Sequence, residues 1–395
     1  MTARFTTGPV RGFSLIELLV AVAIGLALTL AVTLTLIRSE GARRTLTATN
    51  DISNNGAYLA FSLDRQLRSA GSGFTQVWRN AYGCPLQATR AGVAILPRAA
   101  AYPAPFASVA QTLRLAPLVV HAGIGASGSD VLILQSGSAG LSESPMPVLT
   151  NSATGSALRV PITLGLQGAD LMAVVQDNDV NDNPQPCALL QVANGFAGAA
   201  DQDLSLGGNF HATTIGSVSL VDVGTTQRAW VAPLGNEATN RPNFQLLGVS
   251  AQRTLVAYDL LRLDGGNAVV PVADGVVDLR ARYGVDTNDD GRVDTWVSPA
   301  AAGWTAAALL NGSAAARTSL SRILSVRVAL VFRGTVPEMQ GGQLINVTPA
   351  TLTLFDDLGT GLQVNHSVAV ANRALRHRVL DFTVPLRNAM LTQRP

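Results

Sequence analysis

The sequence contains no lysine and carries little charge of either sign. Its 28 basic residues are all arginine, 26 residues are acidic, and charged residues make up only 14% of the 395-residue chain. The formal net charge is +2, and the arginines are scattered along the chain rather than clustered. Nucleic-acid-binding domains usually carry a basic patch or stripe. We therefore exclude nucleic acid as a partner, and we attribute the missing lysine to genome composition rather than to function.

Sequence motifs of catalysis are also missing. The four histidines, His121, His211, His366 and His377, lie far apart, and neither H-E-x-x-H nor G-x-S-x-G occurs. Residues 123–128 spell G-x-G-x-x-G, but an apolar strand pattern follows them where a dinucleotide site needs the start of a helix. We expect a glycine-rich turn at this position and no enzymatic activity.

Only two cysteines are present, Cys84 and Cys187, and no C-x-x-C motif accompanies them. Two cysteines on the outer side of a membrane more often form one disulfide than remain free. Such a bridge would close a loop of about 100 residues and, on the chain-entropy model, stabilise the fold by about 4 to 5 kcal/mol. The alternative is a pair of buried free thiols. Neither interpretation makes the cysteines catalytic.

One long apolar run stands out against this low charge. Residues 13–37 contain a single charged residue, Glu17, and a helix of about 20 apolar residues is long enough to cross a bilayer. An ionised carboxylate costs about 2.5 to 3.5 kcal/mol at the centre of a membrane helix, so a carboxylate inside such a run points to a use. The leader, residues 1–12, holds Arg4 and Arg11 and no acid. By the positive-inside rule the N-terminus stays in the cytoplasm and the chain after the run lies across the membrane.

Residues 38–70 continue the helical pattern in an amphipathic form. Leucine and isoleucine recur there at three-, four- and seven-residue spacings, and two glycines follow as a stop. The sequence therefore predicts an α+β fold in which one long N-terminal helix packs its amphipathic half on a large antiparallel β-rich head. We divide that head into a β-rich insertion or subdomain, residues 71–250, and a C-terminal β-rich domain, residues 251–395.

Short β-like runs make up the sequence of the head. Residues 277–285 and 380–386 alternate between apolar and polar side chains, and residues 325–332 are apolar on both faces, which predicts a central strand. The other candidate strands are residues 131–134, 171–175, 188–192, 218–223, 229–234 and 255–263.

A candidate calcium loop follows the run at 277–285. Calcium loops place oxygen ligands at alternate positions and a glycine at the sixth, because the backbone must turn sharply around the ion. Gly291 is the sixth residue of DTNDDGRVDTW, and Val297 stands where the twelfth-position glutamate is expected. Calcium is thus the one candidate ligand, and the alternative is a polar turn between two strands. The candidate metal ligands are Asp286, Asn288, Asp290, the carbonyl of Arg292, and Asp294.

The start of the apolar run resembles the type IV prepilin signal. In GFSLIELLV, Gly12, Phe13 and Glu17 occupy the positions of the family's glycine, its first mature residue and its acid. The resemblance implies cleavage between Gly12 and Phe13 by the prepilin peptidase, followed by N-methylation of the Phe13 amine. It also implies a role for Glu17 in filament assembly, where the carboxylate pairs with the N-terminus of a neighbouring subunit.

Three later stretches, residues 57–71, 322–334 and 376–388, resemble the minor pilins of the PilW family. This resemblance implies a bacterial inner-membrane protein with one membrane pass and a periplasmic head, which then moves to the pilus, at its tip. Its expected partners are the prepilin peptidase, other minor pilins, the major pilin and the inner-membrane assembly platform. Its role is to prime and cap the pilus, with no required cofactor.

Two other functions stay open at this point. A pseudopilin of a type II secretion system shares the signal and the helix. From a different class, the head could be a calcium-dependent adhesin or ligand-binding module at the pilus tip.

Overall fold

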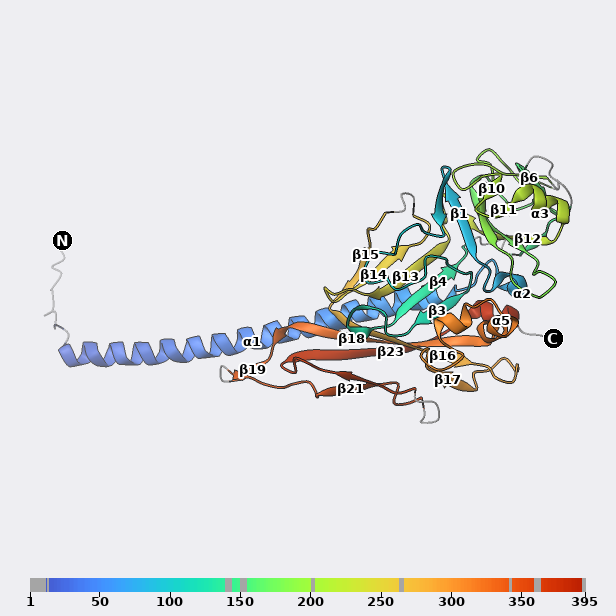
Figure 1. Ribbon diagram of the computed structural model, residues 1–395. Helices are drawn as coiled ribbons and strands as arrows, with labels where there is room; N and C mark the ends of the chain where they lie inside the picture. Colours follow the sequence, from blue (N-terminus) through green and yellow to red (C-terminus); the bar gives the residue numbers. More distant parts are fainter. Residues whose placement is uncertain are drawn as a thin grey trace, which may run out of the picture. The chain divides into compact units, whose positions relative to one another are not determined.

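The computed structural model describes residues 12, 14–138, 144–149, 155–199, 203–262, 266–340, 343–358 and 364–392. It divides into two compact units, Met1–Asp51 and Ile52–Pro395. We call the second unit the head. Helix α1 (Leu15–Arg68) runs through both units as 54 continuous residues, which confirms the single long helix that the sequence predicts (Figure 1).

The end of α1 is fixed by glycines and by the C-terminal segment of the chain. Gly71 and Gly73 have φ angles of +79° and +88°, in the left-handed region where glycine is unstrained. The Asn388 side-chain amide donates to the carbonyls of Ser69 and Ala70, the two residues that follow α1, at 3.1 Å each. A residue more than 300 positions away in sequence therefore holds the turn that ends α1.

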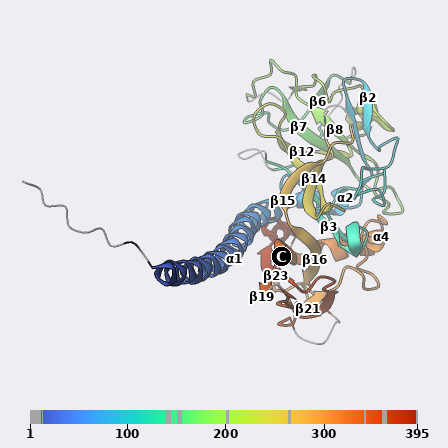
Figure 2. The same cartoon turned by 90° about the vertical axis from the view of Figure 1, so that its left-hand side faces the viewer.

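Three sheets form the body of the head, and two views of it place the six-stranded sheet at one end, the five-stranded sheet in the middle and the four-stranded sheet at the other end (Figures 1 and 2). The six-stranded sheet, in the order β2-β1-β8-β7-β12-β5, contains β1 (Leu86–Arg90), β2 (Val93–Leu96), β5 (Met146–Pro147), β7 (Asp170–Gln176), β8 (Cys187–Gln191) and β12 (Ala229–Asn236). The pair β1 and β8 is parallel, and the other pairs of this sheet are antiparallel.

The other two sheets are antiparallel throughout. The five-stranded sheet, β15-β14-β13-β4-β3, contains β3 (Leu118–His121), β4 (Val131–Ser136), β13 (Asn243–Val249), β14 (Thr254–Asp259) and β15 (Val270–Asp274). The four-stranded sheet, β17-β16-β18-β23, contains β16 (Val276–Val285), β17 (Thr295–Val297), β18 (Ile323–Pro337) and β23 (Leu375–Pro385). Because β13 and β14 lie on opposite sides of residue 250, the boundary drawn there from the sequence falls inside one sheet.

Small elements complete the described part of the head. The two-stranded pairs are β6 (Ala157–Arg159) with β9 (Asp203–Ser205), β10 (Thr214–Ile215) with β11 (Val218–Ser219), β19 (Met339–Gln340) with β20 (Gln343–Leu344), and β21 (Thr351–Leu354) with β22 (His366–Ala369). The short helices are η1 (Thr75–Val77), α2 (Trp78–Ala81), η2 (Ala126–Gly128), α3 (Leu220–Thr226), α4 (Ala306–Leu309), α5 (Ala314–Ser321) and η4 (Arg387–Thr392).

Most of the predicted strands are confirmed, and one is wrong. Residues 218–223 form the two-residue strand β11 and then the start of α3. The Ser219 hydroxyl accepts the N–H of Asp222 as an N-cap, and Gln227 ends the helix in the left-handed conformation. These caps stabilise a short helix, although the alternation of the segment predicted a strand. The glycine-rich stretch 123–128 ends in the 3₁₀ turn η2, ahead of strand β4, as expected.

Strand β18 is central because both of its faces are covered. Val328, Leu330 and Phe332 point into the main core, whereas Ala329 and Val331 point into a small core beneath β21. This arrangement confirms the prediction of a strand that is apolar on both faces. The amphipathic part of α1 belongs to the main core, which contains its leucines Leu59, Leu63 and Leu67.

A buried polar joint connects the middle and four-stranded sheets. The Asp130 carboxylate, just before β4, accepts the N–H of Ala281 on β16 at 3.0 Å, and the N–H of Asp130 donates to the Leu279 carbonyl at 2.8 Å. The Arg280 guanidinium forms two ion pairs: its Nη1 lies 3.4 Å from Oδ1 of Asp130, and its Nε lies 3.0 Å from Oδ1 of Asp278. Burial raises the pKa of both carboxyls above the ordinary value. The sequence offered no sign of this joint.

We predict that Leu63→Ala destabilises the head by about 2 to 5 kcal/mol, because Leu63 is 2% exposed and its truncation leaves a cavity in the main core. Phe61→Ala on the same helix is the matched control. Phe61 is 68% exposed, so we expect its loss to change the unfolding free energy by less than about 0.5 kcal/mol. Thermal unfolding of the full-length variants in detergent measures the difference, and equal melting temperatures would contradict the packing of α1 on the head.

Candidate functional site

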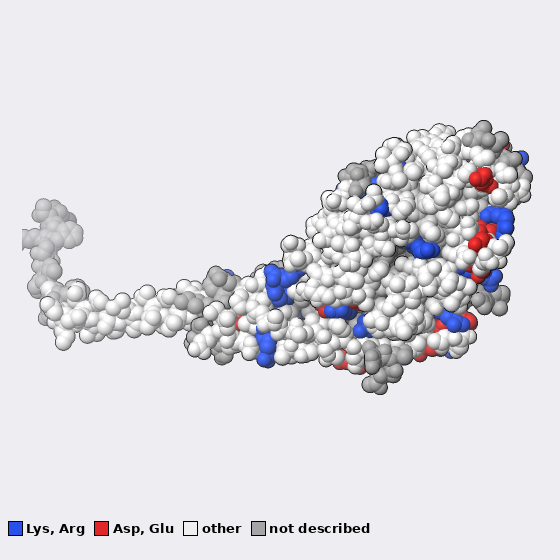
Figure 3. Space-filling model, viewed as in Figure 1, with Lys and Arg blue, Asp and Glu red and all other residues white. Residues whose placement is uncertain are grey.

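The N-terminal part of α1 has the length and composition of a membrane span. None of the 22 residues of Leu15–Leu36 is buried in the structure. Its large apolar side chains are all about half or more exposed, from 48% at Leu34 to 78% at Leu15. Apolar surface of this extent is stable only in lipid or against other apolar helices. Charged side chains are scattered singly or in small groups over the face of the head in Figure 3.

Hydroxyl groups within and just after this span are satisfied by the helix itself. The hydroxyls of Thr29 and Thr33 donate to the carbonyls four residues earlier, each at 2.7 Å. Thr35 donates to Val32 at 2.7 Å, and Ser39 donates to Leu36 at 2.9 Å. An unsatisfied polar group inside a bilayer costs several kcal/mol. These hydroxyls therefore do not oppose insertion of the helix into lipid.

Glu17 lies in the first turn of α1 and is exposed. A carboxylate at that position is favoured by the positive end of the helix dipole. Among the described residues, no ion pair involves Glu17. Gly12 is also exposed, whereas Phe13 lies outside the described residues. The carboxylate is therefore available to a group on another molecule.

The part of α1 that belongs to the head has two contrasting faces. Leu59, Leu63 and Leu67 are 1 to 2% exposed and form part of the main core. A Cβ atom added at Gly56 would lie 3.6 Å from the Phe332 side chain and 3.8 Å from that of Leu380, in ordinary van der Waals contact, so the helix packs closely on the head at that point. On the other face, Tyr58 and Phe61 are 72% and 68% exposed. We call Tyr58 and Phe61 the aromatic pair.

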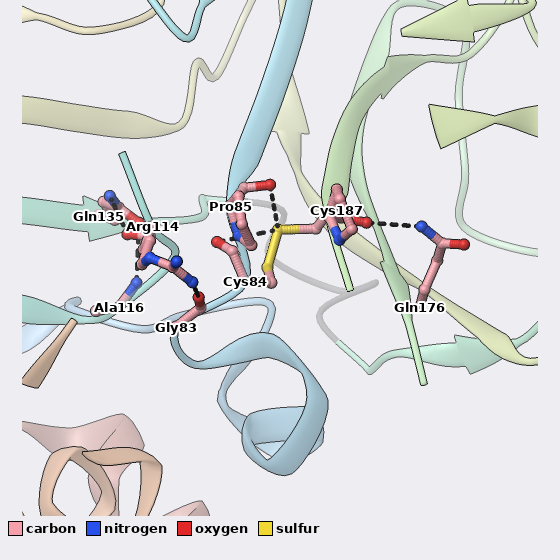
Figure 4. Close-up of a disulfide and its surroundings, with 9 residues drawn as sticks. Gly83, Cys84, Pro85, Arg114, Ala116, Gln135, Gln176 and Cys187 are labelled. Atoms are coloured by element: carbon pink, nitrogen blue, oxygen red, sulfur yellow. Dashed lines mark hydrogen bonds between the residues drawn. A yellow bond between two sulfur atoms is a disulfide. The ribbon is translucent and has the colours of Figure 1, made fainter. Parts of the chain in front are cut away.

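Cys84 and Cys187 form a disulfide with a Cα–Cα distance of 5.8 Å and a sequence separation of 103 residues (Figure 4). Both cysteines are fully buried. Cys187 begins β8, and its N–H donates to the Pro85 carbonyl at 3.0 Å beside the parallel pairing of β1 with β8. The bridge thus ties the segment that follows α2 to the six-stranded sheet.

The candidate calcium loop connects β16 to β17 as a turn held by its own side chains. Asp286 is 3% exposed, and its carboxylate accepts the N–H groups of Gly291, Asn288 and Asp290 at 2.7, 3.2 and 3.3 Å. Asp294 accepts the hydroxyl and the N–H of Thr287, both at 2.7 Å, and these hydrogen bonds lower the pKa of Asp294. Each of the three carboxylates that the sequence assigned to calcium, those of Asp286, Asp290 and Asp294, accepts hydrogen bonds within the turn.

The loop fits calcium in part. Its donors are all oxygen atoms, as calcium prefers. Val297, at the twelfth position, belongs to β17 and pairs with Tyr283, so no carboxylate stands where the bidentate ligand is expected. Throughout the described ranges, no three His, Cys, Asp or Glu side chains gather around a common point. Calcium binding by Asp286, Asn288, Asp290, Arg292 and Asp294 stays a prediction.

The helix defines the class of protein. An apolar span that starts a few residues from the N-terminus, carries one acid in its first turn and continues into a β-rich head is the arrangement of a membrane-anchored pilin. Residues 9–33 match the family model of the prokaryotic N-terminal methylation motif.

The second match lies in the later part of the head. Residues 245–388 match the family model PilW, described as Type IV Pilus-assembly protein W. The resemblance to the PilW family is thus confirmed, and the chain is a type IV pilus-associated pilin that carries a PilW domain. Such proteins are anchored in the membrane and are generally structural rather than enzymatic. Their signal implies interaction with the prepilin peptidase and with the pilus machinery. No curated protein and no solved structure matched the chain.

The PilW match covers the later part of the head only. It begins in β13 and ends in η4, and it includes two of the stretches that suggested the family, residues 322–334 and 376–388. The third, residues 57–71, lies outside it. Residues 34–244 belong to neither match. The six-stranded sheet is built entirely from these residues, so neither family model covers it.

We predict that the disulfide resists reduction in the folded protein. Both cysteines are fully buried, so a thiol reductant reaches them only after unfolding. The Cys84→Ser/Cys187→Ser double variant should lose up to about 4 to 5 kcal/mol, because the 103-residue separation makes the closed loop long. Thiol labelling with and without denaturant, and thermal unfolding of the double variant, check the two statements. Free thiols in the unreduced denatured protein would contradict them.

We predict that Asp286→Ala destabilises the head by about 1 to 3 kcal/mol, because it removes the charged acceptor of the Gly291 and Asn288 N–H groups that holds the turn. The control is Asp290→Ala, which removes an exposed carboxylate from the same loop. Melting temperatures in calcium and in chelator test the metal separately. If the loop holds calcium, the ion raises the melting temperature of wild type and not that of Asp286→Ala; an equal wild-type value in both buffers rules the metal out.

Proposed function

We propose that this protein is a minor pilin that acts structurally in the priming and capping of a type IV pilus. The proposal rests on α1, a 54-residue helix with an apolar span of exposed residues, whose outer leucines belong to the core of the head. Such a helix can leave the bilayer for a bundle of similar helices while its head remains folded. In this account the prepilin peptidase cleaves between Gly12 and Phe13, the new Phe13 amine is methylated, and the head lies in the periplasm before assembly.

Glu17 supplies the specificity of the assembly step. A carboxylate among apolar helices is tolerated when a positive group pairs with it. The processed N-terminus of a neighbouring pilin is such a group, and Glu17 has no ion pair within the described part of this chain. Pairing of the two charges sets the axial register between neighbouring subunits. The partners in this step are other minor pilins and then the major pilin, on the inner-membrane assembly platform.

The aromatic pair extends the assembly surface onto the head. Tyr58 and Phe61 lie three residues apart on α1, one turn of the helix, and both are more than two-thirds exposed. Large aromatic side chains are enriched in the buried centres of protein interfaces. Their place on the assembly helix favours a neighbouring pilin head as the group that covers them.

A pseudopilin role in type II secretion is the second candidate, because the methylation motif and the helix serve both machines. The PilW match favours the pilus. Deletion of the gene separates the two: the pilin role predicts loss of surface pili and of twitching with normal secretion of exoproteins. Normal piliation with blocked secretion would transfer the protein to the secretion system.

We predict that Glu17→Ala leaves cleavage of the leader largely intact and impairs piliation of the deletion strain, since the carboxylate acts after processing. Tyr58→Ala/Phe61→Ala should also impair piliation and leave the head stable, because both side chains are exposed. Immunoblots of the processed form, counts of surface pili and twitching zones measure the effects. Full piliation by both variants would contradict the proposed assembly surface.

A further inference from the structure

A cavity of about 320 Å³ opens between α2 and β12 in the head, and two tryptophans line it. Trp78 comes from α2 and Trp230 from β12, so the chain places two of its four tryptophans at one opening. The polar side chains of the lining are Gln76, Arg79 and Asn80. The cavity thus combines indole surface with two amides and one guanidinium, and it has no carboxylate in its lining.

The carboxylate of Asp177, beside the cavity, orients two of these groups. Its Oδ1 accepts the indole N–H of Trp230 at 3.2 Å and the side-chain N–H of Asn80 at 2.9 Å. Hydrogen bonds to an ionised acceptor are stronger than those between neutral groups. The ring and the amide are therefore held in place, and Asn80 keeps its amide oxygen as an acceptor for a ligand. Among the described residues that oxygen has no donor.

The remaining polar groups are donors. The Gln76 side-chain oxygen accepts the Ser144 hydroxyl at 3.3 Å, which leaves the Gln76 side-chain NH₂ group without an acceptor among the described residues. The Arg79 guanidinium lies 5.6 Å from the centroid of the Trp78 ring, in a cation–π contact, and the side chain is exposed. Asn178 fixes the backbone of α2 by donating to the Arg79 carbonyl at 3.1 Å.

We propose that this cavity binds one pyranose ring of a glycan. A sugar ring presents a face of C–H groups that packs on an indole, and hydroxyls around its edge that both donate and accept. The cavity supplies the indole of Trp230, an acceptor on Asn80, and donors on Gln76 and Arg79. A proline-rich peptide would use the aromatic surfaces, but it offers no ring of hydroxyls to the two amides.

The site is a property of the chain outside the two family matches. Every residue named in it lies between residues 34 and 244, where neither model matches. It uses neither the calcium loop nor α1 residues 15–68. A negative result for glycan binding would therefore not contradict the assembly role, and a failure of the assembly role would not contradict glycan binding.

The test is glycan binding by the full-length protein, purified in a zwitterionic detergent whose head group contains no sugar. The probe is an array of neutral and acidic oligosaccharides of one to four residues, followed by titration of the best binder with tryptophan fluorescence as the readout. We expect binding and a change in emission. Arg79→Ala and Gln76→Ala should each weaken binding by about tenfold, as loss of a hydrogen bond to a ligand does, without lowering the melting temperature.

Two further variants keep the result specific. Trp230→Leu should weaken binding by about tenfold or more, because it removes the stacking surface. Arg253→Ala, at an exposed arginine outside the cavity, should bind as wild type does. Absence of binding to every glycan of the array overturns the proposal. So does equal affinity of Arg79→Ala, Gln76→Ala and Arg253→Ala, or binding of a proline-rich peptide that a glycan cannot displace.

Discussion

The apolar surface of α1 is the constraint on which the rest of this structure depends. Over Leu15–Leu36 every residue is exposed, and only lipid or other apolar helices can cover the apolar side chains. Over its last turns the apolar surface narrows to the stripe Leu59, Leu63 and Leu67, which the head buries in its main core. One continuous helix thus has two kinds of surroundings. A protein built this way can exchange lipid for neighbouring helices without unfolding its head.

The head is organised to keep the end of that helix fixed. Strand β18 is covered on both faces, Asp130 and Arg280 bridge two sheets through a buried polar joint, and Asn388 holds the turn that follows α1. The disulfide adds the six-stranded sheet to this framework from the side of α2. These contacts join segments that are distant in sequence. The part of α1 that belongs to the head and the PilW-matched strands therefore form one unit with residues outside the family match.

The sequence predicted the parts of the structure that local pattern controls. The long helix, its glycine stop, the central strand at 325–332 and most outer strands follow from periodicity and from the residues that flank each element. The strand predicted at residues 218–223 was wrong because the N-cap at Ser219 starts a helix despite the alternation of apolar and polar residues. The sheet that crosses residue 250 was missed because strand pairing depends on distant partners. The Asp130 joint and the tryptophan cavity were missed for the same reason, since their residues lie far apart in the chain.

Mass spectrometry of the mature N-terminus tests whether the apolar helix is a processed pilin helix. The protein is purified from its host membrane, digested, and its N-terminal peptide sequenced. We expect a peptide that begins at Phe13 and carries one methyl group on its α-amine. A peptide that begins at Met1, or one cut at a position after Phe13, would show that the helix is not processed as a pilin helix.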